Sequence, residues 1–327
     1  MTTPAYVVPT LAEIRGWPLS DYCVASLFSG CGGSSLGYRM AGLRVLYANE
    51  FVEAARDTYR ANFPLTYLDP RDVRSVKGAD VLDVCGLEAG ALDVLDGSPP
   101  CASFSSAGKL ERHWRSAKSY SDTHQRTDDL FFEYLRLVDE IRPRVCVAEN
   151  VSGLIRGVAK GLCKQILARF ASLDYHVEAR LLDAQWLGVP QRRSRVIFVA
   201  VRRDLHVAPA LPAPAATRFV IRDALPQLLA LQDTVWHARW IPASQPAPAI
   251  TTAPTHCIEL DKGSTRRALT IPELKRLCSV PDDFVLTGTY AQQWERLGRA
   301  VPPAMMRAIA TTIRERVLDV ARLEASA

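Results

Sequence analysis

The sequence predicts an α/β fold, a doubly wound and mostly parallel β-sheet accompanied by a second, smaller domain. Short apolar runs alternate with amphipathic stretches of helical period between residues 24 and 201. A glycine-rich turn follows the first apolar run, as in nucleotide-type α/β units. From 208 to 254 the sequence becomes rich in proline and alanine, with only short strands predicted. We therefore place the large domain at 1–202 and 266–327 and the small one at 203–265.

Composition is that of an ordinary globular protein, with 48% hydrophobic and 23% charged residues among 327. None of the eight cysteines forms a C-x-x-C pair, which argues against zinc and against a disulfide framework. No run reaches membrane-spanning length, and residues 1–19 lack a signal-peptide pattern. We expect a cytoplasmic protein without a metal or a membrane partner, and its net charge of +5 permits a polyanionic one.

The first α/β unit follows an N-terminal extension or helix, residues 1–21, to which we assign no function. A strand at 24–28 ends in the turn Ser29-Gly30-Cys31-Gly32-Gly33, and a second strand at 45–48 ends in Asn49-Glu50. Glycines let a ligand approach the backbone, and a carboxylate at the tip of the second strand can accept both ribose hydroxyls. The glycine spacing is not that of a dinucleotide site, and a plain packing turn is the alternative.

A further carboxylate is expected at the same sheet edge. After a helix at 51–62, a short strand at 65–68 leads to Asp72. Asp72 could accept a hydrogen bond from an adenine amino group, although aspartate is also common in ordinary turns.

A cysteine follows the next buried strand, 91–95, through Asp96-Gly97-Ser98-Pro99-Pro100-Cys101. Open α/β sheets place their ligands at this strand edge. Two prolines fix the approach to Cys101, which suits a nucleophile, whereas a buried structural cysteine is the alternative.

The polar segment 109–126 has a net charge of +3 and contains Trp114 and Tyr120. Basic residues interleaved with aromatic ones suit a loop that closes on nucleic acid, and a merely solvated loop is the alternative.

Two more site segments follow an amphipathic helix at 129–141. A strand at 145–148 leads to Glu149, either a capping acid or a partly desolvated catalytic one. After a helix at 162–172 and a strand at 175–182, Arg193 and Arg195 share one face of an extended stretch before the strand 196–201. Two guanidinium groups on one face indicate an acceptor-rich ligand, unless they form a surface charge run.

Residues 236–240 include a cluster of Trp236, Arg239 and Trp240. Helices and turns are again predicted at 266–283. A final helix is expected at 304–323, with Pro303 in its first turn.

Together these segments closely resemble the cytosine-C5 DNA methyltransferase family, in the family's order and over nearly the whole chain. The matching residues are Phe28-Ser29-Gly30-Cys31-Gly32-Gly33, Glu50, Asp72, Pro99-Pro100-Cys101, Glu149-Asn150-Val151, Gln191-x-Arg193-x-Arg195, 267–270, 281–284 and 298–303.

The resemblance implies a Rossmann-like methyltransferase domain that uses S-adenosylmethionine. Cys101 would add to C6 of a cytosine flipped out of double-stranded DNA, a protonated Glu149 would contact N3 and N4, and Arg193 and Arg195 would hold the base. The residues implied to bind the cofactor are Phe28, Ser29, Gly30, Gly32, Gly33, Glu50, Phe51, Asp72, Val73, Pro100, Leu130, Ala300 and Val301. The expected DNA contacts are Ser105, Lys109, Arg112, Arg115, Lys118, Gln191, Trp236 and Arg239, with 109–126 as a lid over the site.

Three departures from the family pattern qualify this reading. Ala102 stands where the family usually has Gln, and Arg299 where it usually has Asn. The segment Ala247 to Thr252 resembles the end of the recognition region, which leaves only about 203–246 for reading sequence. So small a recognition region would imply a short or degenerate recognition site, a partner subunit or an unusual substrate.

The expected protein is a bacterial or phage-encoded DNA methyltransferase, of the kind found with restriction enzymes. A tRNA methyltransferase is one alternative, although the Cys-Phe-Thr signature of that branch is missing. The other is a DNA-binding subunit that is active only with a partner.

Overall fold

The computed structural model describes residues 5–100, 118–120, 123–125, 129–156, 159–233, 239–254, 256–261 and 265–325. Six of the expected site residues lie outside these ranges: Cys101, Ser105, Lys109, Arg112, Arg115 and Trp236. Lys118 is described only as the start of a strand, and of the lid expected at 109–126 the structure describes 118–120 and 123–125.

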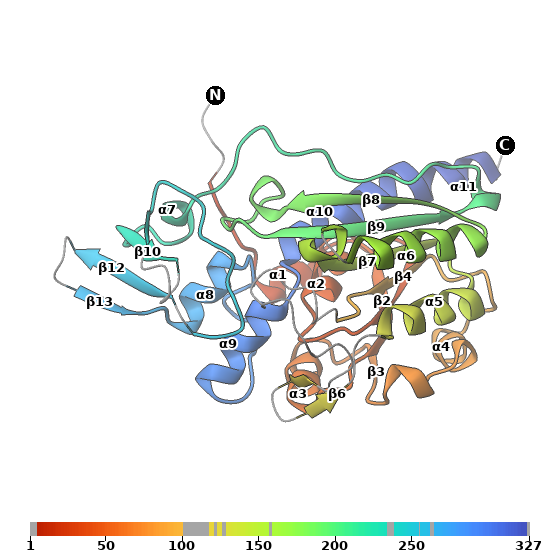
Figure 1. Cartoon of the computed structure of the whole chain (residues 1–327), viewed down its shortest axis with the longest axis horizontal. Helices are drawn as coiled ribbons and strands as arrows, with labels where there is room; N and C mark the ends of the chain where they lie inside the picture. Colours follow the sequence, from red (N-terminus) through yellow and green to blue (C-terminus); the bar gives the residue numbers. More distant parts are fainter. Residues whose placement is uncertain are drawn as a thin grey trace.

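A seven-stranded sheet forms the centre of the molecule, in the order β3-β2-β1-β4-β7-β9-β8 (Figure 1). The first five strands in this order run parallel, and β9 is antiparallel to both β7 and β8. Their bounds are β1 Cys23–Leu27, β2 Arg44–Asn49, β3 Tyr67–Asp69, β4 Val94–Gly97, β7 Val145–Val151, β8 Tyr175–Asp183 and β9 Ser194–Arg202.

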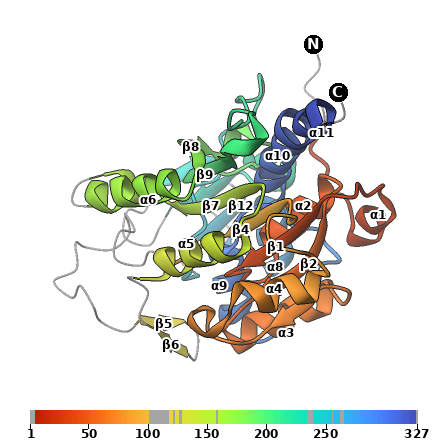
Figure 2. The same cartoon turned by 90° about the vertical axis from the view of Figure 1, so that its right-hand side faces the viewer.

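Helices cover both faces of this sheet, because its central strands are apolar on both sides (Figure 2). One face packs against α4 (Gly78–Cys85), α5 (Leu130–Ile141) and α6 (Lys160–Ser172). The other packs against α2 (Gly33–Met40) and α10 (Pro303–Ile313), and α3 (Glu53–Asn62) follows β2. Short 3₁₀ turns at 73–75, 152–155, 184–186 and 203–205 connect these elements.

A smaller antiparallel sheet lies beside the large one, in the order β11-β10-β12-β13. Its strands are β10 Ala230–Gln232, β11 Trp240–Pro242, β12 Cys257–Asp261 and β13 Thr265–Ala268, and α7 (Ile221–Ala224) precedes them. One core joins this sheet to α8 (Ile271–Leu277), α9 (Tyr290–Arg299) and the outer face of α2. A separate hairpin pairs β5 (Lys118–Tyr120) with β6 (Thr123–Gln125). The predicted fold class is confirmed, while the exact domain boundaries stay a prediction.

At the two ends of the chain the structure agrees with the sequence and adds detail. Of the two alternatives for residues 1–21 the helix is present, and α1 (Leu11–Gly16) buries Leu11 and Ile14 in the core of the smaller sheet. Asp283 accepts hydrogen bonds from the Leu11 and Ala12 N–H groups at the start of α1. The expected last helix is present, and it contains a π-helical turn at 314–318 between α10 and α11 (Asp319–Ala325). No helix within the described ranges is long and apolar enough to cross a membrane.

Candidate active site

A cavity of about 550 Å³ opens where the carboxyl ends of β1, β2, β4 and β7 meet. This volume falls in the range of small-molecule sites, and the carboxyl edge is where open α/β sheets bind ligands. The wall includes many residues expected from the sequence: Phe28, Ser29, Gly30, Gly33, Glu50, Phe51, Val73, Pro100, Glu149, Arg193, Arg195, Ala300 and Val301.

The glycine turn after β1 needs glycine for two different reasons. Gly32 has a φ of +94°, and a side chain there would collide with the ring of Phe63. At Gly33, which begins α2, an added Cβ would lie 2.3 Å from the carbonyl oxygen of Val301. The turn and the segment before α10 are thus in direct backbone contact, and together they form one wall of the cavity.

Glu50 anchors this turn from the tip of β2. Its two carboxylate oxygens accept hydrogen bonds from the N–H groups of Gly30 and Val52, both at 2.7 Å. Burial raises the pKa of the Glu50 carboxyl, although these bonds and the nearby Arg56 and Arg296 oppose the shift. A carboxylate oxygen has more than one lone pair, so Glu50 can still accept a ligand hydroxyl.

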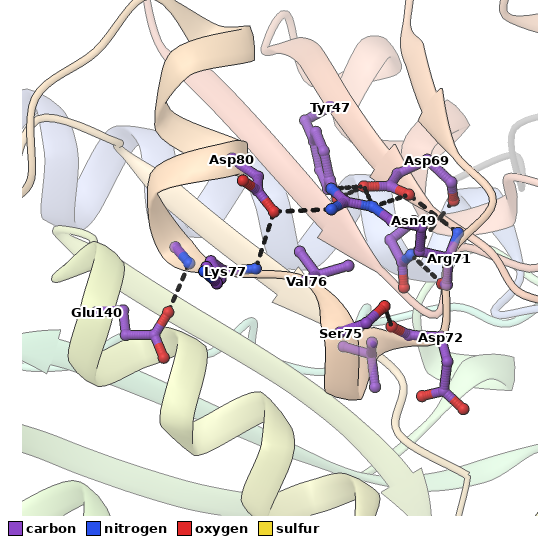
Figure 3. A network of polar contacts seen from close by, with 12 residues as sticks. Tyr47, Asn49, Asp69, Arg71, Asp72, Ser75, Val76, Lys77, Asp80 and Glu140 are labelled. Atoms are coloured by element: carbon purple, nitrogen blue, oxygen red, sulfur yellow. Dashed lines mark hydrogen bonds and ion pairs between the residues drawn. The ribbon is translucent and has the colours of Figure 1, made fainter.

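The loop after β3 is held by the polar network of Figure 3, which runs from Tyr47 through Asp69 and Arg71 to Asp80. In this loop Val73 lines the cavity, but Asp72 does not. Asp72 instead caps the 3₁₀ turn by accepting from the N–H of Arg74, whose guanidinium it also meets at 3.1 Å. The expected contact with an adenine ring therefore stays a prediction.

Leu130 is another expected cofactor residue that does not line the described cavity wall. It is fully buried at the start of α5, because the amphipathic helix turns this side chain into the core.

On the opposite wall Glu149 and Arg195 form an ion pair, with 2.7 Å between Glu149 Oε1 and Arg195 Nε. The pair bridges β7 and β9, and both side chains face the cavity while being largely buried. The next residue, Asn150, donates its amide N–H to the carbonyl of Pro99 at 3.2 Å. Asn150 therefore fixes the proline pair that precedes Cys101.

Among the described residues Arg193 forms no ion pair with an acid. It instead connects two distant segments of the chain. It donates to the carbonyl oxygens of Ile250 at 3.2 Å and Gly298 at 2.9 Å. Its Nε is buried and has no hydrogen-bond partner among the described residues, although the side chain lines the cavity. Burial, with the neighbouring charge of Arg195, lowers the pKa of Arg193 to about 9.

Gln191 is not placed to contact DNA, which corrects the expectation. It is fully buried, accepts from the Ile250 N–H at 3.2 Å and donates to the Leu277 carbonyl at 3.3 Å. Gln191 shares a face with Arg193 and Arg195, but the segment from 247 to 250 packs over it, and its role is to hold that segment.

Part of the wall was not predicted from the sequence, because it lies on segments that reach the cavity only through tertiary contacts. Arg296 of α9 lines the cavity and has a buried Nη2 without a hydrogen-bond partner among the described residues. Its other nitrogens donate to the carbonyls of Ala54 and Gln292. The apolar neighbours Trp294 and Leu297 could have indicated the buried face of α9, but not that Arg296 reaches the site. The other wall residues that were not named as site residues are Cys31, Ser34, Asn49, Val52, Ala55, Ser98, Pro99, Asn150 to Ser152, Ala249 to Thr252, Glu295, Gly298 and Arg299, some of which lie within the quoted motifs.

The described part of the chain holds no group of three or more His, Cys, Asp or Glu side chains arranged to bind a metal. Arg239, expected to contact DNA, is exposed beside β11.

Comparison with known proteins shows the family to which the chain is related. Residues 22–237 and 231–315 match the family model of the C-5 cytosine-specific DNA methylases. The Type II methyltransferase M1.HphI of Haemophilus parahaemolyticus is 30% identical over 337 residues, which cover 89% of this chain and 87% of that protein. The Type II methyltransferase M.FnuDI of Fusobacterium nucleatum is 27% identical over 347 residues, covering 90% and 94%.

A solved E. coli chain encoded within a prophage and described as a DNA modification methyltransferase shares the fold. Its TM-score is 0.73 at 19% identity, over 91% of this chain and 100% of that one. Because the family model spans most of the sequence and the first of these relatives matches nearly end to end, the chain belongs to the C-5 cytosine-specific DNA methylase family.

Proposed function

We propose that this chain transfers the methyl group of S-adenosylmethionine to C5 of a cytosine in double-stranded DNA. The observation that carries the proposal is the Glu149–Arg195 ion pair, which faces the same cavity as the glycine turn and Glu50. A cytosine offers both kinds of hydrogen-bonding group to such a pair, since N3 and O2 accept and the 4-amino group donates.

The cavity wall fits S-adenosylmethionine on two grounds. At Gly30 an added Cβ would have no atom within 4 Å, so the missing side chain leaves open space in the wall beside Glu50. The unpartnered Nη2 of Arg296 offers a buried donor near Glu50, which suits the oxygens and ring nitrogens of an adenosine. When bound, this cofactor supplies an electrophilic methyl group.

The chain's own residues would prepare cytosine to accept that methyl group. Cys101, as the thiolate, adds to C6, and a proton on Glu149 supports the negative charge that develops at N3. C5 then takes the methyl group, a base removes the C5 proton, and elimination at C6 releases the Cys101 thiolate. Arg195 holds Glu149 in place, and Arg193 keeps the 247–252 segment against the site.

The DNA contacts stay proposals. The basic segment 109–126, with Ser105, Lys109, Arg112, Arg115 and Lys118, is proposed as the lid over a flipped base, and Trp236 and Arg239 as contacts in the recognition unit. A partner subunit for recognition is also kept as a prediction, because the reading unit is small. The location of the protein in the cytoplasm of a bacterial or phage-infected cell also stays a prediction.

The test is base-resolution mapping of 5-methylcytosine in DNA from a methylation-free host that expresses this chain. We expect marks in one short motif, and none with the Cys101→Ser variant, which should still bind S-adenosylmethionine. Unmarked DNA beside methylated tRNA would point to the RNA alternative. Activity that requires an added protein chain would support the partner-dependent one.

A further inference from the structure

A diagonal row of polar side chains crosses four adjacent strands, with two members at the cavity wall and two deeper in the sheet. Ser26 of β1, Asp96 of β4, Glu149 of β7 and Arg195 of β9 point to the same face of the sheet, because side chains alternate along each strand. The same face is apolar around Ser26 and Asp96, where Val24, Val94 and Val147 lie in the core. Asp96 is the ionisable member of this row that the mechanism above does not use.

Asp96 makes two hydrogen bonds that join three elements. Its Oδ2 accepts from the Ser26 hydroxyl at 2.8 Å, and its Oδ1 accepts from the Tyr38 hydroxyl of α2 at 3.2 Å. Ser29, in the glycine turn, donates its hydroxyl to the Ser26 carbonyl at 2.7 Å. These contacts connect the strand that leads to Cys101 with the strand and helix on either side of the glycine turn.

An ionisable group is a costly choice for this position. Asp96 is 1% exposed, and burying a carboxylate in an apolar layer is unfavourable unless it gains partners. Burial, together with the charge of Glu149, raises the pKa of Asp96 to about 7, against the opposing hydrogen bonds from Ser26 and Tyr38. Among the described residues, the other ionisable groups that interact electrostatically with Asp96 are the tyrosines Tyr38 of α2, Tyr59 of α3 and Tyr134 of α5, and no cation is among them.

We propose that Asp96 is a positioning residue for methyl transfer, one that aligns the approach to Cys101 with the glycine turn and acts in its neutral form. This inference rests on the function proposed above.

The neutral form is favoured by charge. An ionised Asp96 places a negative charge one pleat deeper than Glu149 on the adjacent strand, on the side of the site where negative charge develops at N3 of the base. It also lies five residues before Cys101, where negative charge opposes formation of the thiolate. Ionisation of Asp96 therefore lowers the rate of methyl transfer.

The test is the single-turnover rate of methyl transfer to unmethylated plasmid DNA with saturating S-adenosylmethionine, from pH 5.5 to 8.5. Asp96→Asn keeps an acceptor for Ser26 or Tyr38 but cannot ionise. We expect its rate, divided by the wild-type rate, to rise about tenfold between pH 6 and 8, because the neutral fraction of a group titrating near 7 falls by that factor. A ratio that stays constant with pH would overturn the proposal.

Asp93→Asn is the matched control. Asp93 is also buried and lies on the same chain segment, but it pairs with Arg144 and the Cys23 N–H at the far end of β4. We expect its ratio to wild type to be flat across this pH range. A rise equal to that of Asp96→Asn would also count against the proposal, because the effect would then be general.

Tyr38→Phe keeps the inference testable if Asp96→Asn does not fold. Removing the hydroxyl that donates to the ionised Asp96 carboxylate should raise the pH at the midpoint of the rate profile. An unchanged midpoint would mean that a group other than Asp96 causes the fall in rate. A wild-type chain that methylates neither DNA nor RNA would contradict the proposed function and this inference with it. An active wild type with a flat Asp96→Asn ratio would contradict only the role of Asp96.

Discussion

Arg195 Nε lies 2.7 Å from Glu149 Oε1, and the two side chains join β7 to β9 at the cavity wall. Both are largely enclosed, with 16% and 11% of the side chain exposed. Such a pair restricts the carboxyl of Glu149 to one position. The contribution of the pair to protein stability and the catalytic role of Glu149 are therefore linked.

Arg195→Met should therefore cost both stability and activity. We expect the free energy of unfolding to fall by about 3 kcal/mol, because the partner carboxylate stays buried without its cation. We expect methyl transfer to fall about 100-fold under saturating cofactor, since Glu149 is no longer held. Urea unfolding and single-turnover rates measure the two effects.

Arg180→Met is the control for that substitution. Arg180 and Glu178 form an ion pair within β8, the strand next to β9, but the Arg180 side chain is 46% exposed. Loss of an exposed pair should cost less than about 1 kcal/mol and leave methyl transfer unchanged. Equal effects at both positions would contradict a special role for the buried pair.

Gly33→Ala should weaken cofactor binding. The added Cβ would lie 2.3 Å from the Val301 carbonyl oxygen, so the glycine turn and the segment before α10 must move apart. Overpacking of this kind costs about 1–3 kcal/mol, which is roughly a tenfold or greater rise in Kd for S-adenosylmethionine by calorimetry.

Gly161→Ala provides the matched comparison. Gly161 lies in α6, and an added Cβ there has no atom within 4 Å. We expect cofactor affinity to stay the same and stability to rise by about 0.5–1 kcal/mol, because alanine is the better helix former. Cofactor binding by Gly33→Ala that matches the wild type would show that the turn tolerates the shift.

Arg296→Met should also reduce affinity for S-adenosylmethionine. If the unpartnered Nη2 donates to the adenosine, its loss removes a charge-assisted hydrogen bond worth about 1.5–3 kcal/mol, or at least about a tenfold change in Kd. Arg60→Met, on an exposed pair of α3, is the control and should bind normally. An unchanged Kd for folded Arg296→Met would make Arg296 a purely structural residue.

Glu273 should make the fold sensitive to acid. Burial alone would raise its pKa, but the ion pair with Arg267 and the capping bonds from Thr270 lower the pKa of Glu273 to about 2. The folded state therefore holds the charged form more tightly than the unfolded chain does. This contribution is present above about pH 4.5 and is lost as the pH falls from there to about 2.

The Glu273→Gln variant tests the direction of this pH dependence of stability. We expect it to be less stable than wild type at pH 7 by about 3 kcal/mol, with the difference shrinking as the pH falls toward 2. Urea unfolding at several pH values measures this. A difference that does not change with pH would mean that Glu273 contributes through packing rather than charge.

Much of the site could be predicted because local sequence determines it. Glycine at 30 and 32 is favoured by positive φ angles, and strand ends place Glu50 and Glu149 at one edge because parallel strands share their direction. The alternation of Arg193 and Arg195 with their neighbours also predicted that these two side chains share a face. These are properties of a few neighbouring residues.

The partners of those residues could not be predicted, because they come from distant segments. Ile250 covers Gln191 and turns an expected DNA contact into a buried support, and α9 brings Arg296 to a cavity formed by β1 and β2. Nothing local distinguishes Asp96 from a turn aspartate until Ser26 and Tyr38 enclose it. The sequence alone determined the fold class, the family and the wall that follows the strand ends. Only the tertiary structure decided which polar side chains face the cavity and which are buried supports, because burial and pairing depend on contacts between segments far apart in the chain.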